Sequence, residues 1–160
     1  MLHPEIPKEG EARKPRPGET EDELAEPLRS AARDAGLIMR PPPVRCNTMY
    51  ALEATEYAQQ RGKFLEFHRA AYRALWEDGK DLGDLAVIEE IGRDVGLNSA
   101  DLLASLEKKF YEPVVLGQYQ EALRHGVNGI PTFVVGNLLF TGAHPYSIFR
   151  SAMNQVLQTK

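Results

Sequence analysis

Over most of this chain, apolar residues are spaced with the period of an α-helix. Apolar residues recur three or four positions apart, which predicts a succession of amphipathic helices. The predicted helices cover residues 20–36, 47–62, 64–76, 84–96, 99–106, 113–126 and 145–156. Glycine or proline separates most of these runs, so the pattern favours several short helices that share one core.

The period changes to that of a β-strand at only one place. Residues 132–135 and 138–141 are short β-prone runs, and Gly136 and Asn137 between them form a two-residue turn signal. The sequence therefore predicts a mostly α fold with one small β-hairpin near the C-terminal end. A hairpin alone is marginally stable, so we expect it to pack with the helices in one structural unit.

Local signals set the expected ends of the helices. Thr20 and Glu23 have the spacing of a capping box, while Pro27 is expected to kink or shorten the helix that follows them. Asp84 and Ser99 are predicted to be the N-caps of their helices.

Length and charge restrict the class of protein. The 160 residues fit one domain with a real core, and 19 Lys+Arg against 23 Asp+Glu give a net charge of −4, which argues against nucleic acid as a partner. The apolar runs are too short for a membrane helix, and the charged N-terminus, with Glu5, Lys8, Glu9 and Glu11, is not typical of a signal peptide. We therefore expect a cytoplasmic protein that does not contact membranes. Residues 1–19, rich in proline and charge, are expected to form an extended arm.

Cys46 is the only cysteine, so an intramolecular disulfide cannot form. A lone cysteine is usually an inert small hydrophobe, although a helix beginning just after Cys46 would lower its pKa and make it a possible reactive thiol. The histidines are scattered without the spacing of a helical metal site, and we expect neither a metal nor a cofactor.

The most informative segment is Gly126-Val127-Asn128-Gly129-Ile130-Pro131-Thr132-Phe133, which runs from a helix stop into the first strand. Proline at a strand start can simply mark an edge strand, and most X-Pro bonds are trans. In a tight turn, however, an X-Pro bond is where a cis peptide is found.

Together with the hairpin and the Thr141-Gly142-Ala143-His144-Pro145 stretch after it, this segment resembles the closing part of DsbA-class thioredoxin-fold proteins. The greatest similarity is to the FrnE-like branch. The resemblance extends to the Leu2-His3-Pro4-Glu5-Ile6-Pro7 start and to Arg45-Cys46-Asn47-Thr48. It implies an incomplete thioredoxin-like α/β fold with a helical insertion at 20–110 and a thioredoxin-like helix-hairpin-helix part at 111–160.

The resemblance also implies a function. Members of the family carry a first strand and a Cys-x-x-Cys helix ahead of the point where this chain starts, so we expect a truncated thiol-disulfide oxidoreductase homologue, inactive or weakly active, with no catalytic residue of its own. The substrate-binding positions carried over are Gly129, Ile130 and Pro131, with His144 beside them. Their expected ligand is a thiol or disulfide peptide, or glutathione, held by backbone groups.

Two other interpretations stay open. The chain could be a non-catalytic binding module whose open hairpin edge pairs with a second copy or with a strand from another polypeptide. The helical period alone is also compatible with an all-α bundle that carries a minor hairpin.

Overall fold

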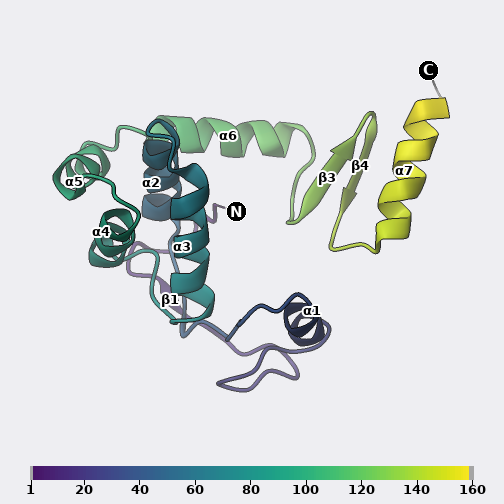
Figure 1. Cartoon of the computed structure of the whole chain (residues 1–160), viewed down its shortest axis with the longest axis horizontal. Helices are drawn as coiled ribbons and strands as arrows, with labels where there is room; N and C mark the ends of the chain where they lie inside the picture. Colours follow the sequence, from purple (N-terminus) through teal and green to yellow (C-terminus); the bar gives the residue numbers. More distant parts are fainter. Residues whose placement is uncertain (1, 159–160) are drawn as a thin grey trace. The chain divides into compact units, whose positions relative to one another are not determined.

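The computed structural model describes residues 2–158, which form seven α-helices and four short β-strands (Figure 1). In chain order they are β1 (Glu11–Ala12), α1 (Leu28–Asp34), β2 (Val44–Arg45), α2 (Met49–Gln59), α3 (Phe64–Trp76), α4 (Leu85–Asp94), α5 (Ser99–Glu107), α6 (Glu112–Arg124), β3 (Thr132–Val135), β4 (Leu138–Thr141) and α7 (Tyr146–Gln158). The predicted class, mostly α with a small hairpin, is confirmed.

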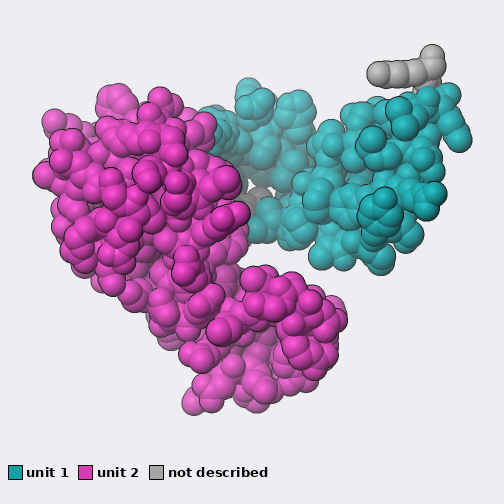
Figure 2. Space-filling view, viewed as in Figure 1, with its two compact units in different colours: residues 1, 117–160 teal, residues 2–116 magenta. Residues whose placement is uncertain are grey.

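The chain divides into two compact units, which Figure 2 colours separately. The helical unit comprises Leu2–Leu116, and the hairpin unit begins at Gly117. The boundary falls within α6, so the first turns of this helix belong to the helical unit and its later turns to the hairpin unit.

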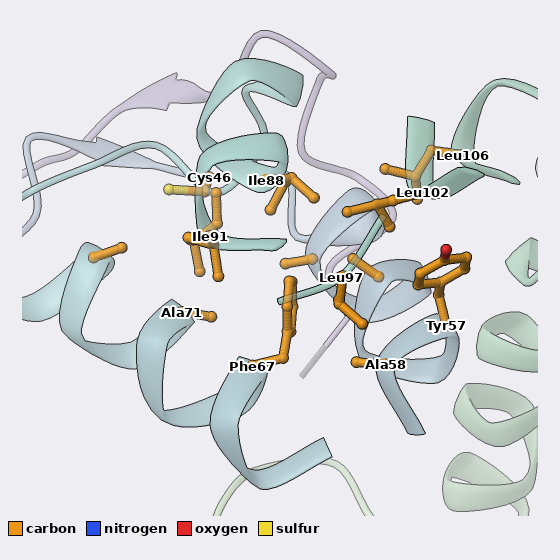
Figure 3. Close-up of a cluster of buried hydrophobic side chains, with 14 residues drawn as sticks. Cys46, Tyr57, Ala58, Phe67, Ala71, Ile88, Ile91, Leu97, Leu102 and Leu106 are labelled. Atoms are coloured by element: carbon orange, nitrogen blue, oxygen red, sulfur yellow. The ribbon is translucent and has the colours of Figure 1, made fainter. Parts of the chain in front are cut away.

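The core of the helical unit lies between α2, α3, α4 and α5. Its side chains come from the apolar faces that the helical spacing predicts, and Figure 3 shows them pointing toward one another. The largest fully buried members are Tyr57, Phe67, Ile88, Leu102 and Leu106. Because several helices contribute to one cluster, the four helices stabilise one another.

The N-terminal arm is attached to the helical unit. Its strand β1 pairs antiparallel with β2, in a register that places Glu11 opposite Arg45. The side-chain amide of Asn47 donates to the Ile6 carbonyl over 2.7 Å, and Ile6 itself is buried. A ladder, a hydrogen bond and buried apolar side chains therefore hold the arm, which contains turns as well as extended residues.

Helix α1 begins later than the capping signal at Thr20 predicts, and the shortening expected from Pro27 is confirmed. The Glu23 amide does donate to Thr20 Oγ1 over 3.0 Å, but this bond closes a turn, and the helix begins only at Leu28. Pro27 is the reason, since proline has no N–H to give and its ring crowds the carbonyl four residues earlier. Pro27 accordingly occupies the N-cap position.

The cap of α4 was predicted correctly, and that of α5 was displaced by one residue. Asp84 accepts a hydrogen bond from the Ala86 amide over 2.8 Å. In α5 the N-cap is Asn98, whose side-chain oxygen accepts from the Asp101 amide over 2.9 Å, while Ser99 is the first helical residue. Asn and Ser are about equally good N-caps, so the sequence alone could not choose between the two neighbours.

The hairpin has the predicted strands and turn. Phe133 lies opposite Phe140, and Val135 opposite Leu138, so two residues connect the strands. Gly136, the first of these two, has φ +62°, a conformation that favours glycine in a tight hairpin turn. Phe149 of α7 contacts both strand phenylalanines edge-on, which fixes α7 against one face of the hairpin.

Candidate functional site

The outer edge of β3 carries backbone groups without a strand partner. The Gly142 amide donates to the Pro131 carbonyl over 2.8 Å, which sets the alternation of the ladder. Phe133 and Phe140 therefore exchange backbone hydrogen bonds, whereas Thr132 and Val134 direct their N–H and C=O groups away from β4. Within residues 2–158 no third strand joins this sheet, so the β3 edge is open.

The predicted docking segment lies at the start of this edge. Ile130 is 63% exposed, and the Ile130–Pro131 peptide bond is cis. The Thr132 hydroxyl donates to the Gly129 carbonyl over 2.6 Å, so a local hydrogen bond holds the segment that precedes β3. Among the described residues no hydrogen bond joins the Ile130 backbone to another group. Its N–H and C=O are therefore available to a ligand.

His144 lies at the same end of the hairpin. Its Nε2 is 3.0 Å from the Thr141 carbonyl oxygen, and its ring meets Phe140 edge-on. Thr141 is in turn bonded to Thr132 through the two hydroxyl groups, 2.9 Å apart. The structure thus brings Gly129, Ile130, Pro131 and His144 together at one end of the sheet. A ligand there would meet mainly backbone N–H and C=O groups, with the His144 imidazole beside them.

Cys46 belongs to the helical unit and lies at the edge of its buried core (Figure 3). The residue is 8% exposed, and burial, reinforced by Asp81, raises the pKa of the thiol to about 11. The lowered pKa that a reactive Cys46 would need is not found, and the raised pKa agrees with the inert small hydrophobe that a lone cysteine usually is. Helix α2 begins three residues later, at Met49, whose amide is already bonded to the Asn47 side chain. Cys46 is therefore a poor nucleophile.

We expect Cys46 to react slowly with iodoacetamide in the native protein. Raising the thiol pKa from 9 to about 11 lowers the thiolate fraction at neutral pH about 100-fold, and burial slows access further. Mass spectrometry of timed samples would measure the rate. The matched control is the same chain in denaturant, where the rate should approach that of free cysteine. Equal rates in the two conditions would contradict the buried, protonated thiol.

Sequence reasoning missed Glu53, the one charged residue that is buried among residues 2–158. Glu53 is on α2, and only 1% of its surface is exposed. Burial and the nearby Glu112 carboxylate raise its pKa, while the backbone N–H groups of Tyr111 and Glu112 and the Lys109 cation partly offset this rise. Its position three residues after Tyr50 and four before Tyr57, on the apolar face of α2, is the signal that could have identified it.

The raised pKa of Glu53 predicts a pH-dependent stability difference. The folded state binds the Glu53 proton more tightly than the unfolded state, so this contribution is complete at low pH and is lost as the pH rises through the folded-state pKa. We expect Glu53→Gln to gain stability relative to wild type as the pH increases from 4 to 8. Urea unfolding at several pH values would measure this, and a constant difference across that range would refute it.

Two further features concern metals and membranes. Within residues 2–158, no three His, Cys, Asp or Glu side chains are arranged so that they could hold a metal ion. None of the helices described here has the length and apolar character needed to cross a bilayer.

Comparison with known proteins agrees with the fold. The family model of the DSBA-like thioredoxin domain matches residues 2–154. A probable DsbA oxidoreductase from Streptomyces coelicolor superposes with a TM-score of 0.70 at 24% identity, covering 82% of this chain and 58% of that one. A putative protein disulfide isomerase from Nitrosomonas europaea gives a TM-score of 0.61 at 16% identity, over 94% of this chain and 79% of its own.

One curated relative is the uncharacterised protein YwbO of Bacillus subtilis, 25% identical over 118 residues, which are 71% of this chain and 57% of YwbO. The chain therefore spans little more than half the length of YwbO and of the Streptomyces protein. The two structural matches show the fold, and the family match covers almost every residue. The single cysteine means that these 160 residues hold no Cys-x-x-Cys pair. The resemblance to DsbA-class proteins is confirmed, and the chain belongs to the family of DSBA-like thioredoxin domains.

Proposed function

We propose that this chain, a member of the FrnE-like branch, carries the substrate-docking edge of a DsbA-type thiol-disulfide oxidoreductase, and that these 160 residues have little or no redox activity. The observation that supports docking is the open edge of β3, with the unbonded Ile130 backbone at its start. An extended peptide can add to such an edge as a further strand, through main-chain hydrogen bonds. The ligand is a thiol- or disulfide-containing peptide, or glutathione.

The expected lack of turnover follows from thiol chemistry. In disulfide exchange a thiolate attacks one sulfur of the substrate disulfide, the other sulfur leaves as a thiolate, and a second thiolate must then displace the mixed disulfide. Cys46 is the only thiol, and its pKa of about 11 keeps it protonated at neutral pH. Catalysed insulin reduction by dithiothreitol should therefore stay at the uncatalysed rate.

Docking is tested by titrating the chain with oxidised glutathione and with an eight-residue β-branched peptide that carries a central disulfide. In NMR spectra, the backbone amide signals of Ile130, Thr132 and Val134 should change their chemical shifts when the ligand is added. Val134→Pro removes one outward N–H of β3 without removing a β3–β4 hydrogen bond, so it should weaken peptide binding about tenfold.

The matched control is Leu139→Pro, which removes the equivalent outward N–H of β4. The β3 proposal requires that this variant bind the peptide as well as wild type does. It is refuted if both variants bind equally well, or if the shifted amides belong to β4. Turnover of insulin by the unmodified chain would refute the inactive-site part of the proposal independently of docking.

A second candidate function is a non-catalytic module that dimerises through the hairpin edge. The observation in its favour is the cross-strand pair Val134 and Leu139, which are 64% and 43% exposed beside the unpaired β3 edge. Sedimentation equilibrium over a dilution series would reveal such a dimer, and Val134→Lys should make it monomeric. A chain that stays monomeric at high concentration excludes this function and leaves peptide docking in place.

We propose a cytoplasmic location as well. A buried, protonated single thiol is compatible with a reducing compartment and needs no oxidising one. Fractionation of the source cells with an antibody against the chain would test this, and recovery outside the cytoplasm would overturn it.

A further inference from the structure

The helical unit contains a pocket of about 830 Å³ that borders its packed core. The arm, α2, α5 and α6 form its walls, and Leu2, Ile6 and Leu106, all buried residues, contribute apolar surface to it. Tyr50, Leu103 and Leu116 add further apolar surface. Its volume falls within the range of pockets that hold small molecules, and such pockets are mostly apolar with a few polar groups that fix orientation.

One of those polar groups is Glu53, which lines this pocket. Its Oε2 is buried and has no hydrogen-bond partner among the described residues. Buried carboxylate oxygens are almost always bonded in native proteins, and leaving one unpaired is unfavourable. An oxygen in this state, next to open apolar space, indicates a missing donor.

The charges around Glu53 indicate what kind of donor is missing. Glu53 and Glu112 are neighbouring carboxyl groups, and their mutual repulsion is one cause of the raised pKa of Glu53. The cation beside them, Lys109, is paired with Glu112 through an Nζ–Oε2 distance of 2.8 Å. The other charged residues that line the pocket, Lys8 and Glu107, are exposed. The buried Glu53 carboxyl group therefore has no cation paired with it among the charged residues of the pocket.

We propose that this pocket binds a small molecule with an apolar body and a single protonated amine, whose ammonium group donates to Glu53 Oε2. The apolar walls would cover the body of the ligand, and the ammonium would supply both the missing donor and the missing positive charge. A metal ion fits less well, because the described residues offer no cluster of three ligating side chains. The site lies in the helical unit, so it does not depend on the peptide-docking proposal.

The test uses three probes of similar shape. The full chain is titrated with 2-phenylethylamine, with the neutral 2-phenylethanol and with the anionic 3-phenylpropionate, and binding is followed by NMR. We expect the amine to shift the amides of Tyr111 and Glu112 and to bind at least tenfold more tightly than the alcohol, with the carboxylate weakest. Equal binding of amine and alcohol would overturn the proposal.

Two variants locate the site. Glu53→Gln keeps the shape but removes the charge, so the preference for amine over alcohol should disappear, while Glu89→Gln on α4, outside the pocket, should leave it unchanged. If Glu53→Gln does not fold, the variant Leu103→Trp tests the site instead, because the indole ring fills the pocket and leaves the Glu53 carboxyl group in place. Amine binding that survives Leu103→Trp unchanged would show that the ligand lies elsewhere and overturn the assignment.

Discussion

Phe67→Ala is expected to lower the free energy of unfolding of the helical unit by about 3–5 kcal/mol. Phe67 is 0% exposed and belongs to the cluster in which α2, α3, α4 and α5 meet. Removing the ring forfeits its transfer free energy and leaves a cavity that several helices would have to move to fill. A loss of this size is a large part of the total stability of a small domain. Urea unfolding followed by the fluorescence of Trp76 measures it.

Phe64→Ala is the matched control, since it makes the same change one turn earlier in α3. Phe64 is 38% exposed and stacks on His68 outside the buried cluster. We expect its replacement to cost about 1 kcal/mol or less. Similar losses for the two variants would mean that Phe67 does not occupy the centre of the core.

Gly136→Ala is expected to destabilise the hairpin unit by about 2–5 kcal/mol. The φ of +62° at Gly136 costs an alanine about 1–2 kcal/mol. A Cβ at this position would also lie 2.7 Å from Val156 Cγ2 on α7, and relieving such an overlap costs roughly another 1–3 kcal/mol. Hydrogen exchange of the Phe133 and Phe140 amides would measure the local loss.

Gly126→Ala separates the two causes. Gly126 also has a positive φ, of +77°, but a Cβ there would meet nothing within 4 Å. Its substitution should therefore cost only the backbone part, about 1–2 kcal/mol. If both variants lose the same stability, the contact between the turn and α7 contributes nothing, and α7 does not pack on the hairpin as described.

The features that the sequence predicted best depend on short-range chemistry. The hairpin register follows from the Gly136-Asn137 turn and the alternation on either side, both visible within ten residues. The cap of α4 follows from one aspartate. The capping signal at Thr20 does not start helix α1, because the steric effect of Pro27, which was expected to kink or shorten the helix, delays its start to Leu28.

The features that the sequence could not predict depend on contacts between distant segments. The arm was expected to be merely extended because its partners, Val44 and Asn47, lie far along the chain. The sequence left open a lowered pKa for Cys46, whereas desolvation by the core outweighs any effect of the helix that follows and raises the pKa. Glu53 was missed for the same reason, since its environment is created by the start of α6.

The pairing of β1 with β2 also bears on the order in which the helical unit folds. The register places Ala12 opposite Val44, so this two-residue ladder closes a long segment of chain that contains α1 and several prolines. Closing a loop of that length has an entropic cost that so short a ladder cannot offset by itself. Helices α2 to α5 follow one another closely and bury a shared core, so they can collapse early through sequence-local contacts. The arm should therefore dock last during folding and detach first during unfolding, with the strand of Glu11 and Ala12 as the most easily lost part of the native helical unit.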